Sequence, residues 1–168
     1  ADAGFIRVGS GKTVGEGLSD SVAVENSREA LFELGYKAFK EGRLDAARDW
    51  WTQAADLGSY TAMFNLGMLA VKEGDRAEAR SWYRQAADLG FSEAMDDLGL
   101  MASEDGDRTS AISWWTRAAD LGNPRSMHNL GAQAYMDGDE IAARRWWTRA
   151  ADLGNPESIH NLRVAAEQ

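Results

Sequence analysis

The pattern of apolar and polar residues repeats at a constant interval of 32 residues over most of the chain. The sequence Ala-Ala-Asp-Leu-Gly occurs four times, beginning at Ala54, Ala86, Ala118 and Ala150. A Leu-Gly pair keeps the same interval at Leu34, Leu66, Leu98 and Leu130, and Leu162 falls at the next position. Self-similarity at such an interval is typical of a stacked array of repeats.

Each repeat is predicted to form two antiparallel α-helices, because alanine, leucine and tryptophan recur at three- and four-residue steps. Glycine readily adopts the left-handed conformation that ends a helix, and such glycines are Gly42, Gly58, Gly74, Gly90, Gly106, Gly122, Gly138 and Gly154. Side chains that accept hydrogen bonds at a helix start are expected at Asp75, Asp107, Asp139, Asn123 and Asn155. The expected helices span 28–41, 44–57, 60–73, 75–89, 92–105, 107–121, 124–137, 139–153 and 156–167.

Small and aromatic residues predict how the helices pack. Gly67 and Ala79, and their equivalents in the other repeats, are expected where the two helices of a pair cross closely. Aromatic doublets such as Trp82-Tyr83 occupy adjacent positions, so one ring should fill the core while its neighbour lines the seam between repeats. Arg163 replaces the Leu-Gly glycine in the last helix, which predicts that residues 156–168 form a solvent-facing C-terminal cap.

Residues 1–27 differ from the repeats and are expected to be an extended, glycine-rich segment that precedes a repeat domain at 28–168. Five glycines are mixed with serine, threonine and aspartate, a composition that favours loop over helix. The only short apolar run is Phe5-Ile6-Arg7-Val8. We expect this run to dock on the repeats, either in its own molecule or in a neighbouring one.

Composition narrows the classes of function. The net charge of −9 disfavours general binding to nucleic acid or anionic lipid, because either needs a basic surface. The absence of cysteine excludes disulfides, thiolate metal sites and a cysteine nucleophile. No apolar run approaches 18 residues, so no membrane insertion is expected. A cytoplasmic location and a processed secreted form both stay open.

No cofactor, metal ion or catalytic residue is predicted. Gly9 to Thr13 reads Gly-Ser-Gly-Lys-Thr, but a phosphate-binding loop needs glycine where Ile6 stands, and no helix start is expected at Val14. Acidic residues around Gly106 and Gly138 lack the spacing of a calcium loop and suit helix capping. His128 and His160 occupy equivalent positions in successive repeats, too far apart to share a metal.

These residues resemble Sel-one-like repeats, relatives of the tetratricopeptide repeat. The second repeat carries the matching pattern at Ala62, Leu66, Gly67, Gly74, Asp75, Ala79, Trp82, Tyr83, Ala86, Ala87 and Gly90. The resemblance covers residues 28–168 and implies an all-α, right-handed α-solenoid of four repeats plus the C-terminal capping helix. It also implies a non-enzymatic adaptor that binds a protein or peptide in a concave groove lined by the first helices.

Carried over by repeat register, the resemblance implies that twelve residues contact the partner: Phe32, Tyr36, Phe39, Lys40, Phe64, Met68, Val71, Lys72, Leu100, His128, Tyr135 and Met136. Asp96 and Glu104 fall in the same register. Lys40 and Lys72 favour an acidic residue near one end of the ligand. Two other readings stay open: several of these residues are buried between repeats, or the protein is a structural module that self-associates through its N-terminal segment or its tryptophan seam.

Overall fold

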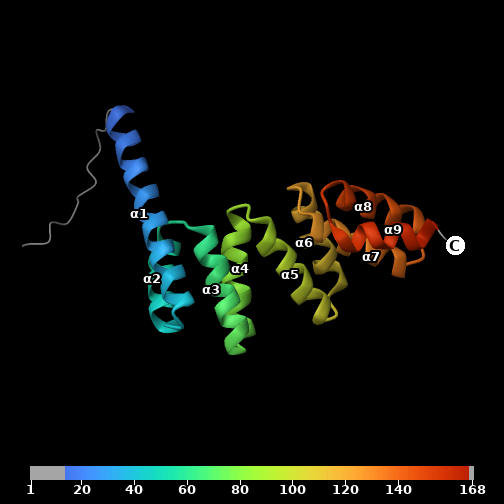
Figure 1. Ribbon diagram of the computed structural model, residues 1–168, viewed down its shortest axis with the longest axis horizontal. Helices are drawn as coiled ribbons and strands as arrows, with labels where there is room; N and C mark the ends of the chain where they lie inside the picture. The colour runs from blue at the N-terminus through green and yellow to red at the C-terminus, as the bar shows by residue number, and fades with distance from the viewer. Residues whose placement is uncertain (1–13, 167–168) are drawn as a thin grey trace, which may run out of the picture. The chain divides into compact units, whose positions relative to one another are not determined.

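The computed structural model describes residues 14–166, with side chains described from residue 21 onward. Within that range the regular elements are α-helices (Figure 1). The first unit, Ala1–Gly58, contains α1 (Val14–Lys40) and α2 (Leu44–Asp56). The second unit, Ser59–Gln168, contains α3 (Tyr60–Glu73), α4 (Arg76–Asp88), α5 (Ser92–Glu104), α6 (Arg108–Asp120), α7 (Pro124–Met136), α8 (Glu140–Asp152) and α9 (Pro156–Ala166).

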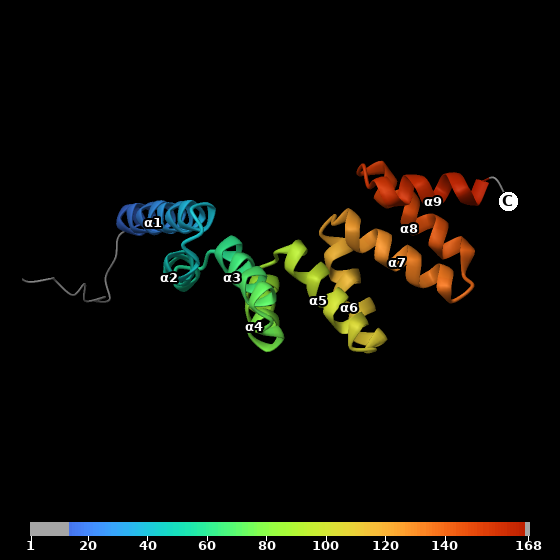
Figure 2. The same cartoon turned by 60° about the horizontal axis from the view of Figure 1, so that its bottom comes forward.

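Each helix of the second unit packs against the helix that follows it in the chain. The pairs α3–α4, α5–α6 and α7–α8 are the repeats, and α4–α5, α6–α7 and α8–α9 are the contacts between successive repeats (Figure 2). In the first unit, α1 packs against α2 in the same manner. The prediction of an all-α solenoid of helix pairs is confirmed.

The predicted helix ends are confirmed. All eight glycines have positive φ, between 74° and 87°, where a side chain would be strained. The backbone N–H groups of Glu78, Ser110 and Ala142 donate to the carboxylates of Asp75, Asp107 and Asp139, at 2.8–3.0 Å. Asn123 and Asn155 accept from Ser126 and Ser158 in the same way. At each of these helix starts, one free N–H group therefore has a partner supplied by the local sequence.

Helix α1 corrects the prediction for the start of the chain. It begins at Val14, so the expected extended segment is wrong for residues 14–27, and the expected boundary at residue 27 lies inside a continuous helix. Only Gly15 and Gly17 of the five N-terminal glycines fall within the helix, and both lie in its first turn. Glycine costs a helix only about 1 kcal/mol per residue, which the following alanine, leucine and glutamate residues offset. Residues 1–13, including Phe5, Ile6 and Val8, lie outside the described residues.

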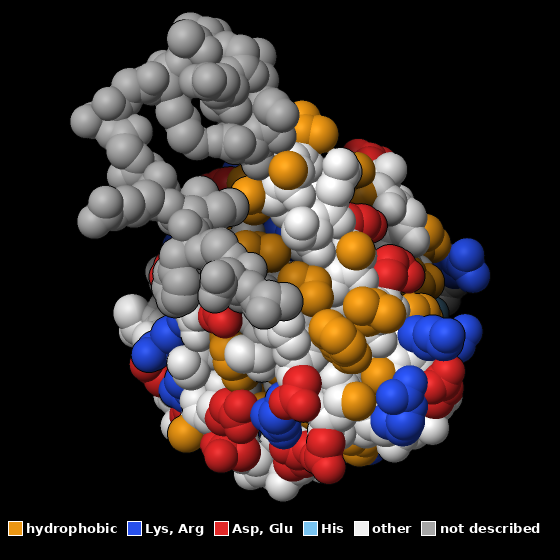
Figure 3. Space-filling model, turned by 90° about the vertical axis from the view of Figure 1, so that its left-hand side faces the viewer, with side chains coloured by type: hydrophobic (Ala, Val, Ile, Leu, Met, Phe, Trp, Pro, Cys, Tyr) orange, Lys and Arg blue, Asp and Glu red, His pale blue; other side chains and the backbone are white. Residues whose placement is uncertain are grey.

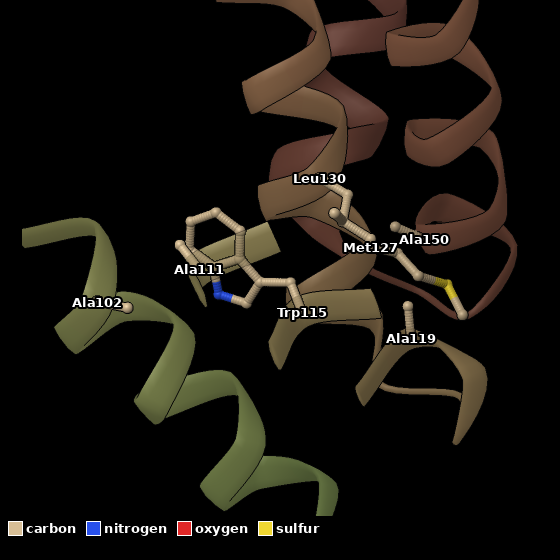
Figure 4. Close-up of a cluster of buried hydrophobic side chains, with 7 residues drawn as sticks. All are labelled: Ala102, Ala111, Trp115, Ala119, Met127, Leu130 and Ala150. Atoms are coloured by element: carbon tan, nitrogen blue, oxygen red, sulfur yellow. The ribbon is translucent and has the colours of Figure 1, made fainter. Parts of the chain in front are cut away.

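The second aromatic residue of each doublet is the centre of its repeat. Trp51, Tyr83, Trp115 and Trp147 are buried, and the first members of the doublets are half-buried. Figure 4 shows the Trp115 ring between Ala102 of α5 and Leu130 of α7, in a cluster that extends to Ala150 of α8. The second ring of each doublet fills the core, as predicted, and among the first rings Trp146 packs against this cluster.

The Leu-Gly glycines make room for these rings. A Cβ atom added to Gly67 would lie 2.5 Å from Cε1 of Tyr83, and Gly35, Gly99 and Gly131 face their tryptophans at 2.3–2.5 Å. Such distances are far below van der Waals contact. The glycine is therefore required by the aromatic ring of the second helix. In α9 the equivalent residue, Arg163, is exposed, in agreement with a cap.

Candidate functional site

Two pockets in the second unit occupy the same register of the repeats. The first, called the α3–α5 pocket, has a volume of about 400 Å³ and is lined by Val71, Gly74, Arg76, Tyr83, Asp97, Leu100, Met101 and Glu104. The second, called the α7–α9 pocket, has a volume of about 550 Å³ and is lined by Ala132, Tyr135, Met136, Glu140, Arg144, Trp147, His160, Asn161, Val164 and Ala165. Each combines apolar side chains with a few polar groups, as ligand sites do.

Six positions are shared by the two pockets, each pair being separated by two repeats along the chain. These pairs are Val71 and Tyr135, Arg76 and Glu140, Tyr83 and Trp147, Asp97 and Asn161, Leu100 and Val164, and Met101 and Ala165. The first helices α3, α5, α7 and α9 supply most of the lining residues, and α4 and α8 close each pocket with their buried rings. The second unit therefore presents two related depressions that differ in chemistry.

The α3–α5 pocket has two acidic lining residues, Asp97 and Glu104, both on α5. Glu104 is held by Arg76, whose Nη1 donates to Oε2 of Glu104 at 2.7 Å. The Nη2 of Arg76 donates to the carbonyl of Met101 and to Oδ1 of Asp105, each at 2.9 Å. The pKa of Arg76 is raised by these carboxylates, the bond to Glu104 first. Arg76 is thus fully engaged within the wall of the pocket.

Asp97 also lies on α5, and its carboxylate is only partly neutralised by Arg125. Its side chain is 20% exposed, and Nη2 of Arg125 lies 3.6 Å from its Oδ1. The same Nη2 atom lies 3.2 Å from Oδ2 of Asp96, which is wholly buried. Burial raises the pKa of Asp97 to about 6, against the lowering effect of Arg125, and Asp96 and Glu93 raise it further. One guanidinium therefore serves two carboxylates.

Several of the predicted contact residues lie in these pockets or beside them. Val71 and Leu100 line the α3–α5 pocket, and Tyr135 and Met136 line the α7–α9 pocket. Val71 is 53% exposed and Met136 is 72% exposed, so apolar surface is available on this side of the helices. Met68 and Lys72 of α3 are also exposed.

Three residues of the predicted register, Phe64, His128 and Asp96, lie instead in contacts between repeats. Phe64 packs against Tyr83 and Phe91, with ring centroids 5.5 and 5.2 Å away. His128 is half-buried, its Nδ1 lies 2.9 Å from Oγ of Ser158, and burial lowers its pKa.

Asp96 was expected on the groove, and that expectation is wrong. It is wholly buried and accepts hydrogen bonds from Ser126 Oγ and Asn129 Nδ2, at 2.6 and 3.1 Å. Helix phase decides whether a side chain faces the groove or the neighbouring repeat, and the sequence fixes that phase only to within about one residue.

The predicted residues of the first unit form a separate aromatic patch on α1. Phe32 stacks with Tyr36 at 6.5 Å between ring centroids, and Phe39 packs against Trp51 at 5.6 Å. Lys40 Nζ lies 5.7 Å from the Tyr36 ring centroid. Tyr36, Phe39 and Lys40 are exposed and Phe32 is half-buried.

Sequence reasoning missed the polar members of the pockets. Asp97 and Asn161 stand next to the predicted register, in the series Asn65, Asp97, Asn129 and Asn161, which repeats every 32 residues. The series begins at Glu33, so the available signal was that Asp97 is the one carboxylate among the four members that lie in the second unit. The contribution of α9 to a pocket was also missed, because that helix was considered only as a cap.

The sequence also contained candidates for a phosphate-binding loop, a calcium loop and a metal site. Gly9 to Thr13 lie outside the described residues. A helix does begin directly after them, at Val14, so that part of the argument against a phosphate loop is wrong, although Ile6 still stands where the motif needs glycine. Asp107 and Asp139 cap helices, as predicted, and Asp105 binds Arg76 and Arg80. Among the residues that the structure describes, no group of three or more acidic or histidine side chains is placed to hold a metal ion.

The face drawn in Figure 3 is mixed in charge. In Figure 3, Asp and Glu side chains lie among Lys and Arg side chains, with hydrophobic groups between them. On α4, Arg76, Arg80 and Arg84 follow one another at four-residue steps, but the first two are paired with Asp105. None of the described helices is long and apolar enough to cross a membrane.

Comparison with known proteins agrees with this architecture. The Sel1 repeat model matches residues 28–59, 92–123 and 124–155, more than half of the chain. The chain belongs to the Sel1 repeat family. The tetratricopeptide repeat model matches residues 60–89, so the second repeat of this Sel1 repeat protein is closer to the related family. The matched segments follow one another from residue 28 to residue 155 with only residues 90–91 between them unmatched, and the expected relationship to both repeat types is confirmed.

Solved structures are similar as well. A Sel1 repeat protein from Oxalobacter formigenes is 32% identical, with a TM-score of 0.58, over 67% of this chain and 94% of that one. Two structures of MamA are each 21% identical, with TM-scores of 0.57 and 0.55; the matches cover 80% and 77% of this chain and 82% and 74% of theirs. At that identity the MamA structures support the fold alone. No curated protein matches the chain significantly.

Proposed function

We propose that this Sel1 repeat protein is a non-enzymatic scaffold that binds a segment of a partner protein along α3, α5, α7 and α9, with apolar anchors in the α3–α5 and α7–α9 pockets. Sel1 and tetratricopeptide repeat proteins generally act as protein-interaction modules. The observation that carries the proposal is the recurrence of the pocket in register, two repeats apart, on one set of helices.

Exposed apolar side chains support this location. Four apolar side chains that line the pockets are at least 40% exposed: Val71, Tyr135, Met136 and Val164. A bound segment would cover them. Burying such side chains is the main favourable term in binding. A short segment also loses conformational entropy when it is ordered, so an affinity on the order of micromolar is expected.

The first unit contributes a second candidate surface at Tyr36, Phe39 and Lys40. Exposed aromatic rings beside a lysine suit a partner residue with an apolar body and an acidic end. Lys72, on α3 of the second unit, favours an acidic partner residue in the same way. Docking of Phe5, Ile6 and Val8 on the repeats stays a prediction.

A peptide-display selection on the full chain tests the proposal. Peptides enriched on the wild-type protein should lose binding to Val71→Arg, which places a charge at the rim of the α3–α5 pocket. Ile141→Arg is the matched control, because Ile141 is a β-branched residue on α8, 68% exposed, that lines neither pocket. Equal binding to both variants would refute the location.

The main alternative is self-association through the N-terminal segment or the half-buried tryptophans. Light scattering of the full chain separates the two readings. A concentration-dependent oligomer that excludes the selected peptides would favour the structural module, whereas a monomer that binds them supports the scaffold.

A further inference from the structure

The α3–α5 pocket places carboxylates next to apolar side chains. Its lining includes Asp97 and Glu104 beside the apolar side chains of Val71, Leu100 and Met101. The α7–α9 pocket has the neutral amide of Asn161 where this one has Asp97. The two pockets therefore differ in charge at an equivalent position.

The structure leaves negative charge at Asp97. Arg125 Nη2, 3.6 Å from Asp97 Oδ1, is closer to the wholly buried carboxylate of Asp96, at 3.2 Å. Glu93, on the same helix, adds a further negative charge. Arg76, on α4, already donates hydrogen bonds to Glu104, Asp105 and the backbone carbonyl of Met101. A cation brought to the pocket would thus meet a half-buried carboxylate that has only part of a counter-ion.

We propose that Asp97 selects a lysine or arginine side chain of the bound segment, whose aliphatic stem lies on Val71 and Leu100 and whose charged head reaches the Asp97 carboxylate. Long basic side chains combine an apolar stem with a charged end, which matches an apolar pocket with an acidic wall. Asp97 is thus a specificity-determining residue that makes the two pockets unequal. This inference rests on the proposed function, because it assumes that a segment occupies the α3–α5 pocket.

Protonation of Asp97 gives a second test of this proposal, because binding of a basic side chain should depend on pH. Burial raises the pKa of Asp97 to about 6, and a cation bound beside the carboxylate favours the ionised form, so binding releases a proton near that pH. The charged and titratable groups facing Asp97 are Asp96 and Glu93 on α5, Arg125 on α7 and the Tyr83 hydroxyl on α4. Burial raises the pKa of the Tyr83 hydroxyl, away from this pH range, and the Asp97→Asn variant tests whether the pH dependence belongs to Asp97.

The experiment uses a random peptide library displayed against the full-length wild-type protein and against Asp97→Asn. Asparagine is the residue at three of the four equivalent positions of the series, the fourth being Glu33, so the variant should fold. Its helical circular dichroism and melting temperature check this. The wild type should enrich lysine or arginine at one position next to apolar residues. Asp97→Asn should keep the apolar preference and lose the basic one.

A synthetic peptide with the selected lysine and no histidine then gives the affinities. It should bind wild type at least tenfold more tightly than Asp97→Asn at pH 7. Between pH 5 and pH 7 its affinity for the wild type should increase about tenfold, as expected for a group with a pKa of about 6, and its affinity for Asp97→Asn should stay constant. Asn161→Asp, which adds a carboxylate to the other pocket, is the reciprocal variant and should create a second basic preference.

The outcomes separate this inference from the proposed function. Peptides enriched for apolar residues alone, or the same basic preference on both proteins, would overturn the role of Asp97 and leave the scaffold intact. If no peptide were enriched on the wild type, both proposals would fail.

Discussion

Replacing Gly67 by alanine should destabilise the second unit, and the same replacement should become stabilising once the Tyr83 ring is removed. The added Cβ atom would lie 2.5 Å from Cε1 and 2.6 Å from Cδ1 of Tyr83. Tyr83 is buried and packs against Phe64, so its ring has little freedom to move away. Relief of the overlap therefore requires a shift of α3 against α4.

The magnitude follows from two opposing terms. Overpacking of a well-packed core costs about 1–3 kcal/mol. Alanine in place of glycine inside a helix gains about 1 kcal/mol. The net loss for Gly67→Ala is therefore up to about 2 kcal/mol in the free energy of unfolding. The Tyr83→Ala substitution itself costs about 3 kcal/mol or more. In that background the overlap is absent, so Gly67→Ala should only add the stability that alanine gives the helix.

Urea denaturation of the four proteins in this mutant cycle measures the coupling. The expected coupling free energy between positions 67 and 83 is about 2 kcal/mol, within the range for residues in direct contact. Arg163→Ala is the control at the equivalent position of α9, where the side chain is exposed, and should change stability by less than about 0.5 kcal/mol. A loss of stability for Gly67→Ala in both backgrounds would refute the ring as the cause.

Three further predictions concern single side chains. Asp107→Ala should cost about 1 kcal/mol in a thermal melt because α6 loses its N-cap, whereas Asp107→Asn should retain most of the stability. Ser126→Ala should cost about 1–3 kcal/mol in urea denaturation, because the buried Asp96 carboxylate loses the donor at 2.6 Å. Burial raises the pKa of Asp97 from 3.8 to about 6, so the folded state binds the proton more tightly; stability should fall as the pH rises from about 4 to about 6, and Asp97→Asn should abolish this fall, while an unchanged pH profile would contradict it.

The sequence predicted the helices of the repeats closely because their ends are encoded locally. Glycines that take positive φ and aspartates that cap N–H groups act within one turn, so pattern and structure agree at Gly74 and Asp75. At the start of the chain the same reasoning failed. The glycines of residues 1–27 were counted as one loop segment, but Gly15 and Gly17 occupy only the first turn of α1.

The candidate site was predicted less well, because it depends on helix phase and on contacts between repeats. Val71, Tyr135 and Met136, which the resemblance places in the groove, do line the two pockets. Asp96 lies one position from Asp97, yet Asp96 is buried by Ser126 and Asn129 while Asp97 faces the pocket. A rotation of about 100° per residue separates the two roles, and periodicity does not resolve it.

The central claim is that a partner segment binds across the α3–α5 and α7–α9 pockets. The most direct measurement is a methyl nuclear magnetic resonance titration of the full chain with a library-selected peptide. The account predicts shifts at Val71, Leu100 and Val164, and none at Ile141 or Leu153, which lie outside both pockets. Shifts concentrated at Ile141 and Leu153, with the pocket methyl groups unchanged, would contradict it.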